Sequence, residues 1–256
     1  MSTGVHRAAA EGYGTAADAY RRSRPGYPDR LVTWLADELR IGPDTDVLDL
    51  AAGTGAFTRG LVPTGARVMA VEPVARMRQI LAAELPGVPA LDGTAEQVPL
   101  PDGAMDVVTV AQAFHWFDGA AAAREIHRVL RPGGRLGVLF SVRDESAPWN
   151  RRLTRMLAPL EGDAPRHRHG RWRAALDTGE WFVRPRELSV PFDRPVTRAG
   201  FLDRVRSISF VASAPEEARA GLLSEIEAML DTDPDLAGRA VIPFAYRAEA
   251  LVLDRR

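Results

Sequence analysis

The chain has 256 residues, of which 46% are hydrophobic and 26% are charged, and its formal net charge is −1. This length and composition fit one large α/β domain, and the charge balance gives no general attraction to nucleic acid or to a membrane. The chain contains no cysteine and no lysine. These absences exclude disulfides, thiolate nucleophiles, cysteine-based zinc sites, Schiff bases and the lysine of a phosphate-binding loop.

The sequence also bears on where the protein works. No apolar run approaches the roughly 18 residues that a membrane-spanning helix needs. Residues 1–14 lack the apolar stretch of a secretory signal. We therefore expect a cytoplasmic protein, either a monomer or a homodimer, with no membrane partner.

Helical and extended patterns alternate regularly through residues 28–140. Leucines recur at four-residue spacing in a helix expected at 28–39, and further helices are expected from Ala56, at 74–85 and, capped by Asp118, at 119–130. Short apolar segments predict strands at 46–50, 67–71, 89–92, 105–110 and 135–140. This alternation is typical of an α/β fold with a Rossmann-like, doubly wound and mostly parallel sheet.

The pattern changes after Phe140. Residues 141–187 have mixed polarity, an Arg/His cluster and three tryptophans, Trp149, Trp172 and Trp181. We interpret this segment as a helical lid insertion over the carboxyl edge of the sheet. A sixth strand is expected at 188–192, a helix capped by Thr197, a helix opened by a capping box from Ser213 to Glu216, and an antiparallel final strand at 240–253.

These elements predict one domain with a sheet of about seven strands. Its expected parts are an N-terminal cap segment (1–27), a cofactor-binding core (28–140), an acceptor lid (141–187) and a C-terminal part of the core (188–256).

A glycine-containing turn directly follows the first strand. Gly53 and Gly55 allow a close backbone approach to a ligand and positive φ angles, and ligands of such sheets bind at this first crossover. Glu72 ends the next strand, where a carboxylate can accept two hydrogen bonds from a ribose diol. Thr58 stands where the third glycine of a dinucleotide fingerprint belongs. The pattern therefore favours an adenosine without a pyrophosphate over NAD.

Two more polar segments follow later strands. Residues 92–103 place short polar side chains and backbone amides at the exit of the third strand, where an adenine edge can be read. Residues 111–117, Ala-Gln-Ala-Phe-His-Trp-Phe, follow the fourth strand. They lie at the centre of the expected carboxyl edge, where a reacting group would sit.

These four elements, in this order and spacing, resemble the class I S-adenosylmethionine-dependent methyltransferase domain. More narrowly, they are similar to the branch with trans-aconitate methyltransferases and ubiquinone/menaquinone-type methyltransferases. Residues 20–28, Pro101-Asp102 and residues 128–134 add to the resemblance, which covers about 13–140. It implies methyl transfer from S-adenosyl-L-methionine to a small molecule, such as an intermediate of specialised biosynthesis.

The resemblance also implies roles for individual residues. The glycine turn and Asp49 would shape the pocket for the methionine part of the cofactor, Glu72 would hold the ribose, and Met77 or Pro73 would pack on the adenine. The full set of implied cofactor-binding residues is Tyr20, Arg24, Asp49, Ala51, Gly53, Gly55, Glu72, Pro73, Met77, Thr94, Ala95, Ala111 and Gln112.

The chain departs from the family pattern at two positions. Ala51 stands where many relatives have the first glycine, so we expect the turn to manage that step without positive φ. Thr94 stands where Asp is frequent, which weakens the expected hydrogen bond to the adenine amine.

The acceptor side is less defined. Substrate-binding candidates are Tyr13, His115, Trp116 and Trp172. A general base is needed only if the acceptor arrives protonated, and the catalytic candidates are His115, His167 and His169. A structural role for His115 and an exposed lid tip for the other two histidines stay open, whereas His127 is expected on the solvated surface. No metal is expected.

Two other functions remain open at this point. A cyclase or decarboxylase that uses the same cofactor would have the same cofactor half. A nucleic-acid-modifying enzyme would need a basic stripe and an Asn-Pro-Pro-aromatic or cysteine motif. The chain has neither, so a nucleic acid partner is not expected.

Overall fold

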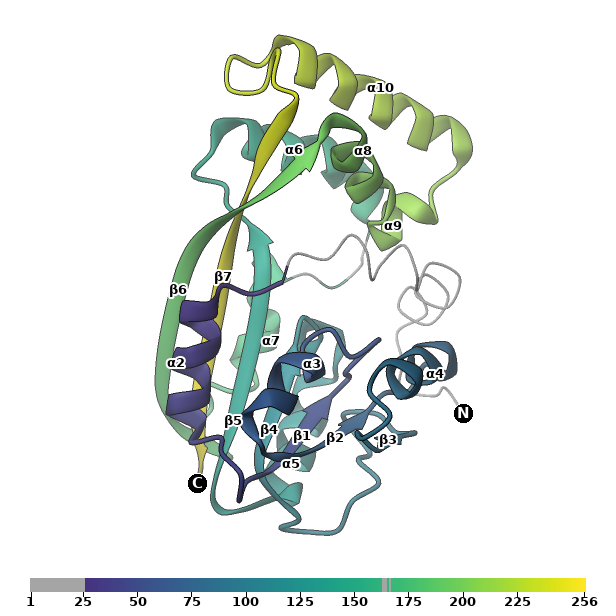
Figure 1. Ribbon diagram of the computed structural model, residues 1–256. Helices are drawn as coiled ribbons and strands as arrows, with labels where there is room; N and C mark the ends of the chain where they lie inside the picture. The colour runs from purple at the N-terminus through teal and green to yellow at the C-terminus, as the bar shows by residue number, and fades with distance from the viewer. Residues whose placement is uncertain (1–25, 163–164, 166) are drawn as a thin grey trace.

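A single mixed sheet organises the molecule. The computed structural model describes residues 26–162, 165 and 167–256, and its strands lie in the order β3-β2-β1-β4-β5-β7-β6 (Figure 1). Strands β1 to β5 are parallel, and β7 is antiparallel to both β5 and β6. The expected fold class is confirmed. The strand bounds are β1 Asp46–Leu50, β2 Arg67–Val71, β3 Ala90–Leu91, β4 Met105–Ala111, β5 Leu130–Arg143, β6 Phe182–Thr197 and β7 Val241–Arg255.

Helices cover both faces of the sheet and one of its ends. The α-helices of the described residues are α2 Asp29–Leu39, α3 Thr58–Leu61, α4 Ala75–Glu84, α5 Gly119–Val129, α6 Pro148–Glu161, α7 Arg171–Ala174, α8 Arg198–Arg206, α9 Ser209–Ala212 and α10 Glu216–Thr232. Short 3-10 helices are η1 Val62–Thr64, η2 Phe114–Trp116 and η3 His167–His169. None of the described helices is both long and apolar enough to cross a membrane.

The apolar patterns of the sequence explain these layers. Leu31, Leu35 and Leu39 of α2 lie on one face of that helix and pack with α3 and α4 against one face of the sheet. On the other face, Ile126 and Val129 of α5 pack over β1, β4 and β5. The central strands are apolar on both sides because both of their faces are buried, as a doubly wound sheet requires.

A third apolar cluster lies beyond the sheet. Helices α6, α8, α9 and α10 pack together at one end of the molecule, around the ends of β6 and β7 (Figure 1). We call these four helices the cap. Strands β5 and β6 reach it because they are longer than the sequence predicted, 14 and 16 residues. The cap thus takes α6 from the expected lid and α8–α10 from the C-terminal part, while the division of the chain into those parts stays a prediction.

The expected N-termini of two helices in the C-terminal half had different outcomes. Thr197 caps α8 as predicted, since its hydroxyl accepts a hydrogen bond from the Gly200 amide at 3.1 Å. The capping box at Ser213 is wrong. Helix α10 begins at Glu216 after Pro215 without a side-chain cap, and Ser213 instead ends α9. Ser213 cannot cap α10 because it is already the C-terminal cap of the short helix α9.

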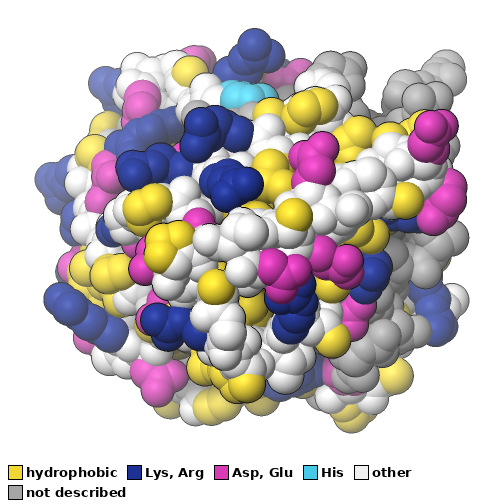
Figure 2. Space-filling model, turned by 90° about the horizontal axis from the view of Figure 1, so that it is seen from above, with side chains coloured by type: hydrophobic (Ala, Val, Ile, Leu, Met, Phe, Trp, Pro, Cys, Tyr) yellow, Lys and Arg dark blue, Asp and Glu magenta, His cyan; other side chains and the backbone are white. Residues whose placement is uncertain are grey.

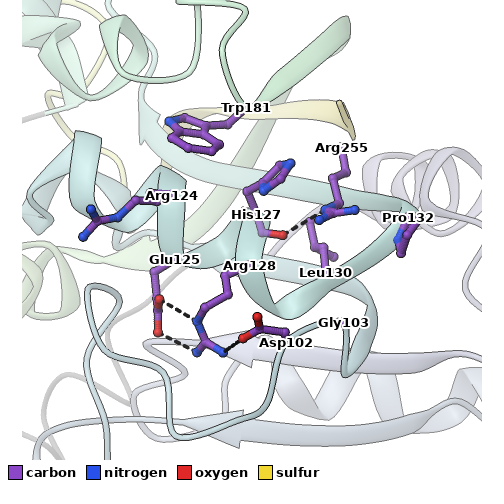
Figure 3. Close-up of a pocket in the computed structure, with 10 residues that line it drawn as sticks. All are labelled: Asp102, Gly103, Arg124, Glu125, His127, Arg128, Leu130, Pro132, Trp181 and Arg255. Carbon is purple, nitrogen blue, oxygen red and sulfur yellow. Dashed lines mark hydrogen bonds and ion pairs between the residues drawn. The ribbon is translucent and has the colours of Figure 1, made fainter.

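An ion cluster on α5 holds the segment that precedes β4. The Arg128 guanidinium donates to Glu125 Oε1 at 2.7 Å and to Asp102 Oδ1 at 2.7 Å, and also to the carbonyl oxygens of Val98 and Leu100. Figure 3 shows these side chains converging in a cavity of about 650 Å³ at the amino edge of the sheet. Arg128 thereby holds residues 98–102, the segment that leads from Thr94 at the carboxyl edge of the sheet to the start of β4 at the amino edge.

The same cavity corrects the expectation for His127. Its ring lies 5.1 Å from the Trp181 ring, and its Nε2 is 3.2 Å from the Arg256 carbonyl oxygen. The side chain is therefore half-buried against the end of β7 and not on the solvated surface, because β7 runs past α5 to this edge.

We expect Arg128→Ala to lower the free energy of unfolding by about 2 kcal/mol, because several charge-assisted hydrogen bonds are lost together. Arg124→Ala is the matched control, since Arg124 is exposed on the same helix, and it should change stability by less than about 0.5 kcal/mol. Urea denaturation measures both. Equal losses in the two variants would contradict a stabilising role for the cluster.

Candidate functional site

Glu72 connects the ends of the two strands that open the fold. Its Oε2 accepts a hydrogen bond from the Gly53 amide at 2.9 Å, and its Oε1 accepts one from the Val74 amide at 2.9 Å. The side chain is 4% exposed, and burial raises the pKa of its carboxyl, while the two amide hydrogen bonds oppose that shift. The carboxylate therefore holds the glycine turn in place.

The turn after β1 uses the left-handed region three times. Ala51, Gly53 and Gly55 have φ angles of 57°, 59° and 79°. The expectation that Ala51 avoids positive φ is wrong, since alanine takes this conformation with only a methyl group to strain it. Among the described residues, a Cβ added to Gly53 would have the Met77 sulfur alone within 4 Å, at 3.8 Å, whereas one at Gly55 would crowd Leu81 at 3.0 Å.

Asp49 lies fully buried behind this turn. It accepts hydrogen bonds from the Thr58 hydroxyl at 2.6 Å and from the Thr109 hydroxyl at 3.1 Å. Burial raises the pKa of Asp49 to about 6. The hydrogen bonds from the two hydroxyl groups lower this pKa, and the negative charge of Glu72 raises it. The sequence pattern indicates Thr58 only as the residue in place of a third glycine. The signal for its contact with Asp49 is a pair of hydroxyl side chains, Thr58 on α3 and Thr109 within the apolar strand β4.

The other cofactor candidates border the same edge. Met77 and Ala95 are each 3% exposed, and Pro73 is half-buried. Thr94 forms an isolated backbone bridge with Gln97. The structure therefore brings the residues that follow β1, β2 and β3 to one edge. Tyr13, Tyr20 and Arg24 lie outside the described residues.

Strand β4 ends in a sharp turn. Ala111 is its last residue, and Gln112 follows with a φ of 64°. The Gln112 amide donates to the Leu139 carbonyl at 2.8 Å, and its side-chain nitrogen donates to the Ser141 carbonyl at 3.3 Å. This positive φ was not foreseen. It ties the end of β4 to β5 and directs the chain into η2.

A cavity of about 610 Å³ separates this edge from the cap. Gln112, His115 and Phe140 line its floor, and Arg204 of α8 and Phe210 line the side facing the cap. Carboxylates and arginines both line it, among them Asp144 and Arg247, which pair at 2.9 Å. Viewed from above, arginine side chains gather over one side of the molecule (Figure 2).

Of the candidate acceptor and catalytic residues, two histidines line this cavity and two tryptophans lie beside those histidines. His115 and His167 line it, and both rings lie near the Phe140 ring, at 5.7 Å and 4.3 Å. Trp172 stacks on His167 at 5.4 Å, and Trp116 adjoins His115 at 5.0 Å. His169 is not among the lining residues, and its Nε2 lies 3.7 Å from Glu161. The glutamates that face these histidines, Glu249 beside His167 and Glu161 beside His169, are not predicted from the sequence.

Comparisons with known proteins decide the family. A family model described as a methyltransferase domain matches residues 48–138. An uncharacterized methyltransferase from Mycobacterium bovis is 38% identical over 234 residues, covering 91% of this chain and 91% of that protein. An uncharacterized methyltransferase-like protein from Schizosaccharomyces pombe is 33% identical and covers 92% of each chain. The chain belongs to the methyltransferase family.

This methyltransferase uses S-adenosylmethionine as its methyl donor, as its family implies. A solved structure of a putative type II methyltransferase from Anaeromyxobacter dehalogenans is 26% identical, with a TM-score of 0.64 over 91% of this chain and 96% of that one. Similarity to the demethylmenaquinone methyltransferase of Mycolicibacterium vanbaalenii is partial, 40% identity over 40% of this chain and 44% of that protein. The menaquinone-type resemblance therefore concerns part of the chain.

The raised pKa of Asp49 predicts a pH-dependent stability. A buried carboxyl with a pKa of about 6 instead of 3.8 is protonated more readily in the folded state than in the unfolded state. The wild type should therefore lose stability relative to Asp49→Asn as the pH rises from about 4 to 6, by up to about 3 kcal/mol, and the difference should then stay constant.

Urea denaturation of both proteins without ligand, at a series of pH values, measures this trend. Asp193→Asn removes an exposed carboxyl and is the matched control. A difference between wild type and Asp49→Asn that does not grow between pH 4 and 6 would show that Asp49 titrates normally.

Proposed function

We propose that this methyltransferase transfers the methyl group to a small molecule bound in the 610 Å³ cavity between the carboxyl edge of the sheet and the cap. The supporting observation is the position of that cavity. Its floor includes Gln112 and His115, which directly follow β4 at the centre of the edge where the cofactor candidates converge. A cavity of this volume suits a small molecule and not a polymer.

The residues at the edge fit S-adenosylmethionine. Beside Gly53, the Met77 sulfur is the one atom of the described residues within 4 Å of an added Cβ, and the methionine part would lie there. Each oxygen of the Glu72 carboxylate accepts one amide hydrogen bond and keeps a lone pair for a ribose hydroxyl. Buried Met77 and Ala95 offer an apolar surface to the adenine, and Thr94 offers backbone groups at its edge. Ala111 and Gln112 would border the sulfonium.

The sulfonium supplies an already activated methyl group, so the protein contributes mainly alignment and exclusion of water. The turn from Gly53 to Gly55 and the turn at Gln112 are fixed by hydrogen bonds to neighbouring strands. The cap closes the cavity from the other side. His115, Trp116 and Trp172 would border the acceptor.

The narrower expectations from the sequence stay predictions. These are a kinship with trans-aconitate methyltransferases, a biosynthetic role, a cytoplasmic location and a monomeric or homodimeric state. The trans-aconitate resemblance makes small carboxylic acids reasonable acceptors to test beside aromatic hydroxyl compounds.

Incubation of the full chain with S-adenosylmethionine and a panel of small acceptors tests the proposed function. We expect S-adenosylhomocysteine to form together with a methylated small molecule, both detected by mass spectrometry. Dependence on the cavity is checked with Phe210→Trp, because a larger ring on the cap side of the cavity should reduce turnover and leave S-adenosylhomocysteine affinity within about twofold. Equal turnover by both proteins would contradict acceptor binding there.

Glu72→Gln tests the cofactor site separately. The amide cannot accept from both the Gly53 and Val74 amides, and it loses the charge that a ribose diol would meet. We expect a loss of about 1.5–3 kcal/mol, or roughly 10–100-fold in S-adenosylhomocysteine affinity by calorimetry. Asp203→Asn removes an exposed carboxyl on α8 and should change affinity less than twofold. Unchanged affinity in Glu72→Gln would remove Glu72 from the ribose site.

A further inference from the structure

A histidine and a glutamate pair on the wall of the acceptor cavity. His167 Nε2 lies 3.1 Å from Glu249 Oε2, and both residues line the cavity. Their side chains are 21% and 36% exposed, so the pair is accessible to a ligand. They come from η3 and β7, which are far apart in the sequence, and the sequence indicated only the histidine.

Aromatic side chains hold the His167 ring. The Phe140 ring lies 4.3 Å from it and the Trp172 ring stacks on it at 5.4 Å. The indole nitrogen of Trp172 also donates to the His167 backbone oxygen at 3.1 Å. The ring orientation is therefore set by packing and by Glu249 together, which is how an orienting carboxylate prepares a histidine for proton transfer.

The position of Glu249 also decides which nitrogen can react. A carboxylate 3.1 Å from Nε2 favours the proton on that nitrogen, and the neutral ring then carries its lone pair on Nδ1. A proton taken up at Nδ1 gives an imidazolium that pairs with the adjacent Glu249 carboxylate. This arrangement suits a general base and not only a surface ion pair.

Other charged groups line the same cavity. His115 faces it from η2, and the remaining charged side chains that line the cavity are Arg143, Asp144, Glu145, Glu161, Arg204 and Arg247. Arg247 pairs with Asp144, and Arg204 donates to the Tyr246 hydroxyl at 2.7 Å. The lining therefore has charges of both signs, and it does not by itself favour an anionic acceptor.

We propose that His167, positioned by Glu249, is the general base that removes the proton from a phenolic hydroxyl of the acceptor. This inference rests on the proposed function. A lone pair of the acceptor oxygen forms the new bond to the methyl carbon, and the carbon–sulfur bond breaks with its electron pair going to sulfur. The hydroxyl proton goes to Nδ1 of His167 and later to solvent.

The class of acceptor follows from what such a base can do. A carboxylic acid is already ionised near pH 7 and needs no base, whereas a phenol with a pKa of about 10 does. The cavity wall also carries flat aromatic side chains, His115, Phe140, Phe210 and Tyr246. Such rings pack well on an aromatic acceptor.

The test uses the full chain, S-adenosylmethionine and a panel of one- to three-ring phenols beside matched carboxylic acids and amines. We expect methyl ethers of at least one phenol. With that phenol, His167→Ala should lower kcat by about 100-fold or more, with KM and S-adenosylhomocysteine affinity within about threefold. Added imidazole should restore part of the rate, and the remaining activity should keep rising with pH as the phenol itself ionises.

Matched variants separate a catalytic role from a structural one. Glu249→Gln should lower kcat by about tenfold and shift the pH profile, and Glu249→Asp should recover part of that loss because it keeps the charge. His127→Gln, at the opposite edge of the sheet, should keep kcat within about twofold.

Three results would overturn the inference. They are unchanged kcat and pH profile in His167→Ala, loss of the pH dependence in His115→Ala instead, or methylation of no phenol in the panel. Any of these leaves the proposed function standing if S-adenosylhomocysteine still binds and Phe210→Trp still impairs turnover of another acceptor. Failure of the wild type to bind S-adenosylhomocysteine would overturn the proposed function itself.

Discussion

The buried carboxylate of Glu72 is the constraint on which the cofactor edge depends. By accepting the amides of Gly53 and Val74, it fixes the turn after β1 relative to the end of β2. Burial raises the pKa of both Glu72 and Asp49, and the charge of Glu72 adds to the increase at Asp49. Carboxyls with perturbed pKa values cluster at functional sites. A bound ribose would add donors to a carboxylate that is already positioned.

The acceptor side depends on strand length. Strands β5, β6 and β7 continue beyond the parallel part of the sheet, and β6 and β7 pair from Phe182–Arg255 to Thr197–Val241. This long antiparallel ribbon carries the cap helices away from the sheet, which leaves a cavity between them. The two sides have different physical origins: local turns shape the proposed cofactor edge, and long-range strand pairing shapes the proposed acceptor cavity.

The difference explains what the sequence could predict. Local signals, such as the glycine turn, the leucine spacing of α2 and the Asp118 cap, predicted the core elements to within a few residues. The positive φ of Ala51 and Gln112 could not be foreseen, because neighbouring strands impose it on residues without that preference. The lengths of β5 and β6, the cap and the Glu249 partner of His167 depend on pairings between distant segments, which one sequence does not display.

The partners of the Arg/His cluster also change what its charge indicates about the acceptor. Read along the chain, the tryptophans and the Arg/His cluster of residues 141–187 suit an acceptor with an apolar body and an acidic or polar end. In the structure His167 faces Glu249, His169 faces Glu161, and Arg173 pairs with both Asp177 and Glu187. The two histidines of the cluster and the nearby Arg173 thus face carboxylates of the same chain. In the proposed reaction the cavity therefore offers the acceptor an oriented histidine among lining charges of both signs, which suits a ligand that gives up a proton.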